Sequence, residues 1–211
     1  MFLTLEGTEG SGKSTLASAL VARLEAAGKR ILRTREPGGC ALGQDIRALL
    51  LDSSRKVAPL AELYLFLADR AQHIEEVIRP ALAEGKWVLC DRFADSTIAY
   101  QGGGRGMDSA WLQRLNDDAV KGLWPDLTLL LDLPEAIGLQ RADARNEREG
   151  LSVKEGRFEA EALAFHQRVR AAFLERAKAY PERFVVLDAT LPPEALADAA
   201  WRVIVERSGE F

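Results

Sequence analysis

A run near the start of the chain, Gly7-Thr8-Glu9-Gly10-Ser11-Gly12-Lys13-Ser14, has the residue types and spacing that bind a row of phosphates. It fits the pattern G-x-x-x-x-G-K-[ST], whose glycines let successive backbone N–H groups curl around one phosphate. In that pattern the lysine bridges the outer phosphates and the hydroxyl of the next residue reaches Mg²⁺. We therefore expect this phosphate loop and the adjoining Thr15 to bind a nucleotide, rather than to form a glycine-rich turn that binds nothing.

Charged residues also follow two other short apolar runs. Asp91 and Arg92 come directly after the run that ends at Cys90, and Arg35-Glu36-Pro37-Gly38-Gly39 follows another run in the same way. If these runs are parallel strands, both groups lie at the carboxyl edge of the sheet, where ligands bind. Asp91 then suits Mg²⁺ or a metal-bound water, and Arg92 suits a phosphate. The alternatives are a surface ion pair for Asp91 and Arg92, and a simple turn for the Pro-Gly-Gly stretch.

Strands that alternate with helices around a mostly parallel sheet would position these residues. The apolar runs are nearly continuous, as expected for strands that are buried on both faces. Five strands are expected, at Phe2–Glu6, Arg30–Thr34, Trp87–Cys90, Leu127–Asp132 and Phe184–Leu187. Helices are expected at Lys13–Ala26, capped by Gly28, at Leu60–Leu82, with a kink or early stop at Pro80, at Glu161–Ala179 and at Pro192–Arg207. The predicted fold class is α/β, with a five-stranded parallel sheet flanked by helices.

One stretch, from Arg145 to Gly156, shows no clear period, because charged residues and two glycines interrupt the helical pattern. We expect a mobile surface segment there. No repeat, low-complexity segment or linker divides the sequence, so residues 1–211 are expected to form a single domain.

The composition limits the kinds of partner that the protein can have. Its formal net charge of -4 at pH 7 argues against the broad basic field that nucleic-acid binding needs. No apolar run approaches the ~20 residues of a bilayer span, and no signal peptide or membrane anchor is visible. Two cysteines, Cys40 and Cys90, cannot form a disulfide framework, so a reducing cytoplasm is expected. We expect a small-molecule substrate, no nucleic acid and no membrane.

A phosphate-binding loop identifies a nucleotide and not a reaction. The sequence lacks the N-K-x-D and D-x-x-G elements of regulatory GTPases and the L-S-G-G-Q signature of transport-type ATPases. It is instead rich in arginines at loop and strand ends.

Four motifs occur in an order and spacing that resemble those of bacterial thymidylate kinases. They are Gly7–Thr15, Arg35–Gly39, Asp91–Phe93 and Ser96–Arg105. The likeness covers nearly the whole chain, through Phe165–Arg170 and Leu187–Ala189. It implies a P-loop kinase fold with a mobile lid, and transfer of the γ-phosphoryl group of ATP to dTMP, giving dTDP and ADP in dTTP supply for DNA synthesis. It also implies that the enzyme needs Mg²⁺ and is a homodimer packed through helices.

The resemblance implies how dTMP is bound. Phe66 and Arg70 lie four residues apart, so on one helix face a ring would stack on the pyrimidine while a guanidinium meets its carbonyl edge. A core phenylalanine beside a snorkelling arginine is the alternative. The other residues expected at the acceptor are Glu9 at the sugar 3'-hydroxyl, Glu36 and Pro37, Arg47 and Arg92 on the monophosphate, Thr97 and Gln101 on the thymine edge, and Tyr100 against the deoxyribose, where it helps to exclude a 2'-hydroxyl.

Phosphoryl transfer needs alignment and cations more than covalent help from the protein. The phosphate loop carries no arginine, so the resemblance implies the type of thymidylate kinase whose catalytic arginine lies in the lid, here about residues 142–157. The expected catalytic residues are Lys13, Arg92, Arg145, Arg148 and Arg157; Arg141 is expected to bind ATP, and Ser14 and Asp91 to bind Mg²⁺. Which lid arginine reaches the transferred phosphate stays open, since charge-rich loops are often only solvated.

Both histidines, His73 and His166, are expected to be helix-surface or packing residues rather than catalysts. No metal or acid–base partner accompanies either of them at a suitable spacing.

Two other functions remain open from the sequence. One is a kinase for a different nucleoside monophosphate. The other is a nucleotide-dependent switch or ATPase that acts through a partner protein.

Overall fold

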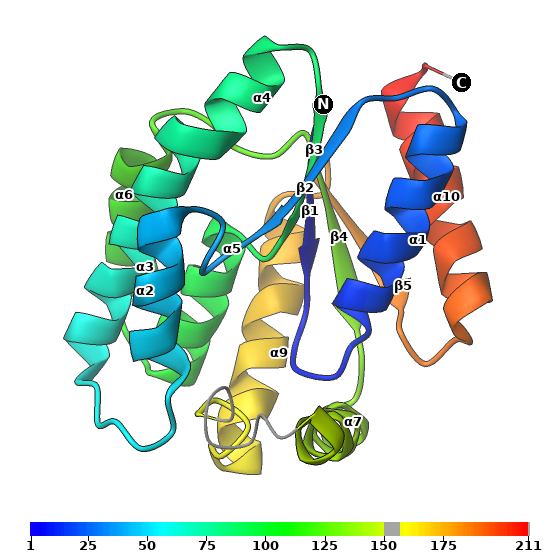
Figure 1. The fold of residues 1–211 in the computed structure, drawn as a ribbon. Helices are drawn as coiled ribbons and strands as arrows, with labels where there is room; N and C mark the ends of the chain where they lie inside the picture. The colour runs from blue at the N-terminus through cyan, green and yellow to red at the C-terminus, as the bar shows by residue number, and fades with distance from the viewer. Residues whose placement is uncertain (150–156, 211) are drawn as a thin grey trace.

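The computed structural model describes residues 1–149 and 157–210, so residues 150–156 of the expected lid lie outside the described chain. Within the described residues the chain forms a parallel sheet of five strands, in the order β2-β3-β1-β4-β5 (Figure 1). The strands are β1 (Phe2–Glu6), β2 (Ile31–Arg35), β3 (Trp87–Asp91), β4 (Leu127–Asp132) and β5 (Phe184–Asp188). All five predicted strands are confirmed, with ends that differ by at most one residue.

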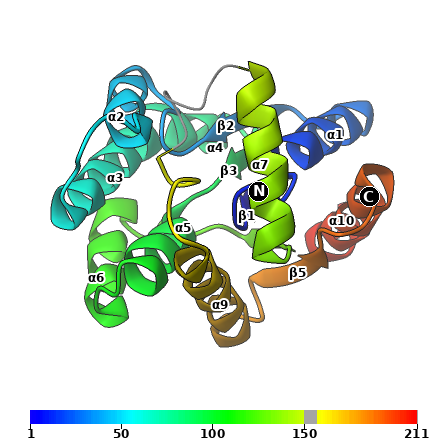
Figure 2. The ribbon, with the colours of Figure 1, turned by 90° about the horizontal axis from the view of Figure 1, so that it is seen from below.

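Helices cover both faces of the sheet. They are α1 (Lys13–Ala26), α2 (Ala41–Leu51), α3 (Pro59–His73), α4 (Arg79–Ala83), α5 (Ala94–Thr97), α6 (Ser109–Val120), α7 (Glu135–Glu149), α9 (Leu163–Ala179) and α10 (Pro193–Ser208), with two π-helical turns, η1 (Ile74–Ile78) and η2 (Ile98–Gly104). Figures 1 and 2 place α1 and α10 on one side of the sheet, and α3, α6 and α9 on the other. The predicted α/β fold class is therefore confirmed.

Successive side chains of β4 enter two different layers of the core. Leu129 joins Leu20 of α1 and Ile204 of α10 in one apolar cluster, whereas Leu130 packs with Phe173 of α9 in another. Because strand side chains alternate between the two faces, a strand covered on both sides must be apolar at consecutive positions. Among the described helices, none has both the length and the apolar composition that a bilayer crossing requires.

The helix expected at Leu60–Leu82 is interrupted near Pro80. Helix α3 ends at His73, η1 forms a wider π turn, and α4 resumes at Arg79 with Pro80 in its first turn. A proline has no N–H, and its ring presses on the carbonyl group four residues earlier, so a wider turn upstream relieves the clash. The predicted interruption is confirmed, but it takes the form of a π turn that precedes the proline.

Four helices, α2, α5, α6 and α7, are not predicted from the sequence. The expectation of a mobile segment that begins at Arg145 is wrong for its first residues, because α7 continues to Glu149. Ala142 and Asn146, one turn apart on this helix, have buried side chains. The composition of this stretch suggests a loop. Burial of these two side chains against the rest of the protein stabilises it as a helix.

The glycines at the end of η2 allow α9 to approach this turn closely. A Cβ built on Gly103 would lie 2.6 Å from the Cβ of Ala172 and 2.8 Å from the carbonyl oxygen of Arg168. The Arg168 guanidinium in turn donates hydrogen bonds to the carbonyl oxygens of Gly103 (3.2 Å) and Gly104 (2.9 Å). This packing fixes η2, and the side chains that it carries, against α9.

We expect Gly103→Ala to destabilise the protein by about 1–3 kcal/mol, because the added methyl group pushes α9 away from η2. Urea unfolding followed by circular dichroism measures the change. Gly102→Ala is the matched control: its Cβ would meet Leu112 at 3.3 Å, so a small side-chain shift accommodates it and the loss should be smaller. A Gly103→Ala protein that unfolds at the parent midpoint contradicts the argument.

Candidate active site

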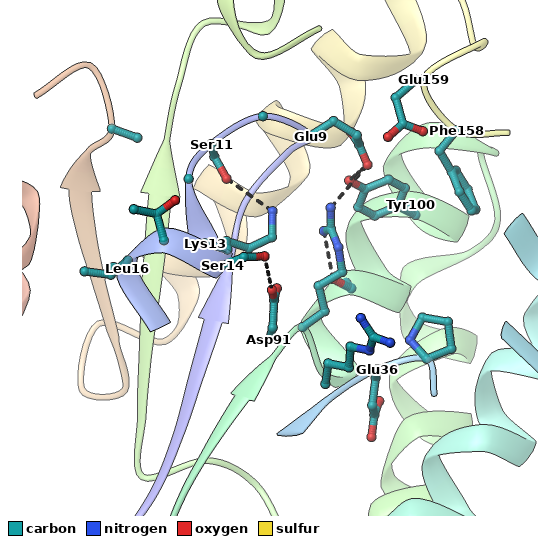
Figure 3. Close-up of a pocket in the computed structure, with 18 of the residues that line it drawn as sticks. Glu9, Ser11, Lys13, Ser14, Leu16, Glu36, Asp91, Tyr100, Phe158 and Glu159 are labelled. Atoms are coloured by element: carbon teal, nitrogen blue, oxygen red, sulfur yellow. Dashed lines mark hydrogen bonds and ion pairs between the residues drawn. The ribbon is translucent and has the colours of Figure 1, made fainter. Parts of the chain in front are cut away.

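A cavity of about 850 Å³ opens at the carboxyl edge of the sheet, where the loops after β1, β2 and β3 meet (Figure 3). Helix α7 passes across this edge in Figure 2 and contributes to the wall. The predicted site residues that line the cavity are Glu9, Gly10, Ser11, Gly12, Lys13, Ser14, Thr15, Glu36, Pro37, Arg47, Phe66, Arg70, Asp91, Arg92, Thr97, Tyr100, Gln101, Arg141, Arg145 and Arg148. Gly7, Thr8 and Arg157 are the predicted site residues that do not line it.

The phosphate loop has a backbone shape that depends on its glycines. Gly7, Gly10 and Gly12 have φ values of 139°, 66° and 91°, which side chains disfavour. A Cβ on Gly7 would also lie only 2.5 Å from the carbonyl oxygen of Leu131 in β4. The loop leads directly into the N-terminus of α1, where free backbone N–H groups and the helix dipole favour an anion.

Lys13 is buried beneath this loop. Its Nζ donates to the carbonyl oxygens of Thr8 (2.8 Å) and Gly7 (3.1 Å) and to Oγ of Ser11 (3.2 Å). Burial, together with the nearby Arg92, lowers the pKa of Lys13 to about 8, although neighbouring carboxylates oppose the shift. A partly desolvated ammonium group of this kind is stabilised when phosphate oxygens come close to it.

Ser14 and Asp91, the two residues expected to bind Mg²⁺, lie together at the cavity. Ser14 Oγ donates to Asp91 Oδ2 over 3.2 Å (Figure 3). A hydroxyl and a carboxylate are hard oxygen ligands that suit Mg²⁺. Within the described residues no group of three or more His, Cys, Asp or Glu side chains could hold a metal ion, so a Mg²⁺ ion here would take most of its ligands from phosphates and water.

Arg92 turns its guanidinium into the cavity from a left-handed backbone conformation, with φ of 69°. Such a conformation costs a non-glycine residue of the order of 1–3 kcal/mol and persists only where the surroundings hold it. The guanidinium donates to the carbonyl oxygen of Gly7 (2.8 Å) and to Glu9 Oε1 (3.2 Å), and lies 5.0 Å from the centre of the Tyr100 ring. Arg92 therefore joins the phosphate loop to the far half of the cavity.

The carboxylate of Glu9 faces the cavity from within the phosphate loop (Figure 3). Its Oε1 accepts hydrogen bonds from Arg92 and from the Tyr100 hydroxyl. Burial alone would raise the pKa of Glu9, but His166, Arg92, Tyr100 and Lys13 outweigh it and lower the pKa to about 2. Glu9 is thus a fixed negative charge among the arginines and the lysine of the site.

Arg70 is held in the cavity wall by partners on several elements. Nε donates to Glu36 (2.8 Å), NH1 donates to Thr97 and Asn116 (both 2.8 Å), and NH2 donates to the carbonyl oxygen of Phe93 (3.1 Å). These bonds use four of the five N–H groups of a guanidinium. The remaining N–H group of Arg70 can reach a ligand, because the side chain lines the cavity.

The Gln101 side chain also has a fixed orientation. Its Nε2 donates to Glu62 Oε1 over 2.8 Å, and Arg105 donates to the same carboxylate. With the amide nitrogen engaged, the amide oxygen of Gln101 is left to accept a hydrogen bond on the cavity side. Phe66, on α3, supplies an aromatic ring to the same wall.

Arg47 and Pro37 connect two other elements of the cavity wall. Arg47, on α2, donates to the carbonyl oxygen of Pro37 over 3.1 Å, and both residues line the cavity. A cation from α2 therefore reaches the turn that follows β2.

Three of the predicted arginines share one helix. Arg141, Arg145 and Arg148 are spaced four and three residues apart on α7, so they lie on one face, and all three line the cavity. Arg141 donates to the carbonyl oxygen of Ala189 (3.3 Å), and Arg145 donates to Oδ1 of Asn146 (2.8 Å). The helix, rather than the loop that the sequence suggests, presents these cations.

Arg157 lies elsewhere. Its NH1 donates to Glu62 Oε2 over 2.7 Å, Nε donates to the carbonyl oxygen of Leu50, and the guanidinium is 4.5 Å from the Phe158 ring centre. The structure therefore places Arg157 beside α2 and α3 and does not bring it to the phosphate loop.

Both histidines are interior packing residues, and each meets a carboxylate of the cavity wall. His73 Nδ1 lies 3.0 Å from Glu36 Oε1, and His166 Nδ1 lies 3.3 Å from Glu9 Oε2. Neither contact is predicted from the sequence, and neither is the place of Glu159 in the cavity wall. Each contact joins residues far apart in the sequence, and no local pattern signals such a pair.

The chain has close relatives among known proteins. Residues 5–200 match the family described as thymidylate kinase. A thymidylate kinase of Solidesulfovibrio magneticus is 60% identical over 207 residues, which is 97% of this chain and 98% of the relative. One from Nitratidesulfovibrio vulgaris is 57% identical over 205 residues, 97% of this chain and 95% of the relative.

A solved structure supports the same assignment. The crystal structure of thymidylate kinase from Ehrlichia chaffeensis superposes with a TM-score of 0.75 at 33% identity, covering 97% of this chain and 98% of that one. The motif order, the five-stranded fold and these matches over almost the whole length agree with one another. The chain belongs to the thymidylate kinase family.

Proposed function

We infer that the protein catalyses the ATP-dependent phosphorylation of dTMP to dTDP, the reaction of its family, which contributes to dTTP supply. The observation that carries this conclusion is a single cavity with a phosphate loop at one end and aromatic and amide side chains at the other. Two nucleotides bound there would meet through their phosphates. Transfer between them needs alignment and positive charge, and little covalent help from the protein.

We propose that ATP occupies the end formed by the phosphate loop. Residues 7–15 would surround its phosphates with backbone N–H groups, and Lys13 would contact the outer phosphates. Arg141, next to Ala189 in the wall, would bind the same nucleotide. Ser14 and Asp91 would hold Mg²⁺, which neutralises charge on the phosphates when it is bound.

We propose that dTMP occupies the other end. The ring of Phe66 would stack on thymine, the remaining N–H group of Arg70 would donate to a base carbonyl, and the amide oxygen of Gln101 would accept from the ring N–H. This pattern of one donor and one acceptor matches thymine. It opposes cytosine, whose ring nitrogen is an acceptor and whose exocyclic group is a donor.

The remaining side chains would bind the sugar and its phosphate. Thr97 lies beside Arg70 at the base, and Tyr100 would pack against the deoxyribose and leave no room for a 2'-hydroxyl. Arg47 and Arg92 would hold the monophosphate beside the turn that carries Glu36 and Pro37. The Glu9 carboxylate would accept a hydrogen bond from the 3'-hydroxyl.

The cations proposed to act during transfer are Lys13, Arg92, Arg145 and Arg148, all of which line the cavity. An arginine that stabilises the transferring phosphoryl group can be worth ~10³ or more in rate. Arg157, which the sequence analysis also expects among the catalytic residues, instead pairs with Glu62, so the support for it is weaker than for Arg145 and Arg148.

Exposed apolar side chains on neighbouring helices favour a homodimer. Leu42 and Leu49 lie on one face of α2, and Leu60 and Tyr64 lie on one face of α3; their exposed fractions run from 40% to 51%. Figures 1 and 2 show α2 and α3 side by side at the surface. We propose that a second copy of the chain covers this face, because monomeric proteins rarely expose such patches.

We also propose that residues 1–211 act as a single domain in a reducing cytoplasm. Both cysteines, Cys40 and Cys90, are free and buried. Burial raises the pKa of each thiol, which makes the reactive thiolate form scarce.

The function is tested by ADP release, measured in a coupled assay with ATP and a panel of acceptors. We expect release to depend strongly on added dTMP and to be at least about 10-fold slower with dCMP, because the donor and acceptor pattern of cytosine is reversed. UMP and AMP complete the panel. Release that is independent of the acceptor would indicate a switch or ATPase, and a preference for another monophosphate would indicate a different kinase.

Lys13→Ala and Arg70→Lys separate the two ends of the cavity. Lys13→Ala should lower kcat at least about 100-fold, because it removes the positive charge proposed to stabilise the phosphates during transfer. Arg70→Lys keeps a charge beside Glu36 but loses the planar fork, so it should raise KM for dTMP roughly 10-fold with a smaller change in KM for ATP. Steady-state kinetics with each substrate varied provide the values, and an active Lys13→Ala enzyme contradicts the phosphate role.

The dimer is tested by light scattering after size exclusion. Tyr64→Glu places a charge in the proposed interface and should shift the protein from dimer to monomer mass, with an unchanged circular dichroism spectrum. Glu25→Gln, at an exposed position on α1, is the control and should leave the mass unchanged. A monomeric parent protein rules out the proposal.

A further inference from the structure

We propose that His166 is a positioning residue for dTMP: it pairs with Glu9 from the side away from the cavity and fixes the carboxylate that receives the sugar 3'-hydroxyl. His166 would thereby make the enzyme selective for acceptors that carry this hydroxyl group. The inference rests on the proposed role of Glu9 at the deoxyribose.

The first support is geometric. His166 lies on α9 with 1% of its surface exposed, and its Nδ1 is 3.3 Å from Glu9 Oε2. Glu9 lines the cavity but His166 does not. The imidazole therefore stands behind the carboxylate, where it can set the orientation of Glu9 without touching the substrate.

The second support is an unequal distribution of hydrogen bonds on Glu9. Oε1 accepts from Arg92 and from the Tyr100 hydroxyl, whereas Oε2 is buried and accepts no hydrogen bond from any described residue. Neither ring nitrogen of His166 has a hydrogen-bond partner there, so the pair is in ionic contact but not aligned. Leaving a buried carboxylate oxygen unsatisfied is unfavourable. The His166 imidazole, 3.3 Å from Oε2, is the group placed to supply the missing donor.

The third support is the charge around the pair. Burial lowers the pKa of His166, but Glu9, with Glu159 and Glu161 from the segment before α9, outweighs burial and raises the pKa above its usual value. Other charged and titratable groups face the pair from each neighbouring element: Arg92, Tyr100 and Lys13 around Glu9, Arg145 at Glu159, and Arg105 at Glu161. The imidazolium form is therefore favoured, and it offsets the repulsion between Glu9 and Glu159.

The packing of α9 holds the imidazole in place. The rings of Phe165 and His166 meet edge to face with centres 5.4 Å apart, and Phe165 in turn contacts Tyr100 at 6.2 Å. The Tyr100 hydroxyl donates to Oε1 of Glu9, the carboxylate oxygen that His166 does not contact. Two neighbouring residues of α9 thus constrain the carboxylate, one directly and one through Tyr100.

The test compares dTMP with 3'-deoxythymidine monophosphate, which differs only by the missing 3'-hydroxyl. In the parent enzyme, kcat/KM should be roughly 10-fold higher for dTMP, the value of a hydrogen bond to a charged group. His166→Phe keeps an aromatic ring but removes both nitrogens, so it should reduce this ratio to within about 3-fold of unity, mainly through KM for dTMP. His166→Asn places an amide donor near the Nδ1 position and should restore most of the preference.

The pH dependence of the same ratio provides a readout that a purely structural role would not move. Since the ionised pair requires the imidazolium, the preference for dTMP should be full at low pH and should fall as the pH rises through the raised pKa of His166. The phosphate of the acceptor and Lys13 titrate equally with both substrates, so they cancel in the ratio. His166→Asn has no titrating ring, and its ratio should not change with pH.

Gln167→Ala, at the exposed neighbouring position on α9, is the matched control and should keep the parent ratio. Thermal melting of each variant shows whether it is folded. If His166→Phe is not folded, the pH profile of His166→Asn tests the role of His166 instead. A parent enzyme that does not distinguish the two acceptors, while still phosphorylating dTMP, overturns the role of Glu9 and this inference with it. A parent that distinguishes them, with variants that do so equally at every pH, overturns the role of His166 alone.

Discussion

The contact between the loop after β1 and the loop after β3 determines where both halves of the site lie. Glu6, the last residue of β1, is fully buried and accepts hydrogen bonds from the N–H of Phe93 (2.8 Å) and Oγ of Ser96 (2.6 Å). Arg92 returns a bond to the carbonyl oxygen of Gly7 (2.8 Å). Because β1 and β3 are parallel neighbours, both loops leave the sheet at one edge. The phosphate loop and the part of the cavity wall formed by the loop after β3 therefore belong to one bonded unit.

This arrangement also explains how several cations coexist in one site. Lys13 is turned onto backbone carbonyl groups, and Arg92 pairs with Glu9. Each cation is thus held in a fixed position by its partners in the protein. Preorganised charges of this kind need little rearrangement during the reaction, which is the main way in which a protein accelerates phosphoryl transfer.

Local patterns in the sequence predict the sheet and the phosphate loop well, because each depends on neighbouring residues. Buried parallel strands are continuous apolar runs, and the loop needs its glycines at fixed spacing. Helix α7 was not predicted, since its charged stretch becomes helical through the burial of Ala142 and Asn146 against distant elements. The same limit applies to His166 and to the pairing of Arg157 with Glu62, which exist only once the chain has folded. Sequence motifs identify many of the residues that line the cavity, but not the buried residues that hold those side chains in place.

Helix α9 is the element that relates the two ends of the cavity to each other. At its middle, Arg170 donates to both carboxylate oxygens of Asp132 (2.6 and 2.9 Å), where β4 leads into the arginine-bearing α7. On another side, the glycines of η2 let α9 press against the turn that presents Tyr100 and Gln101. A shift of α9 would therefore change the distance between the cations of α7 and the cavity wall that η2 forms. Transfer between two bound nucleotides depends on such distances, so the close packing of α9 is a condition for the reaction although none of its residues lines the cavity.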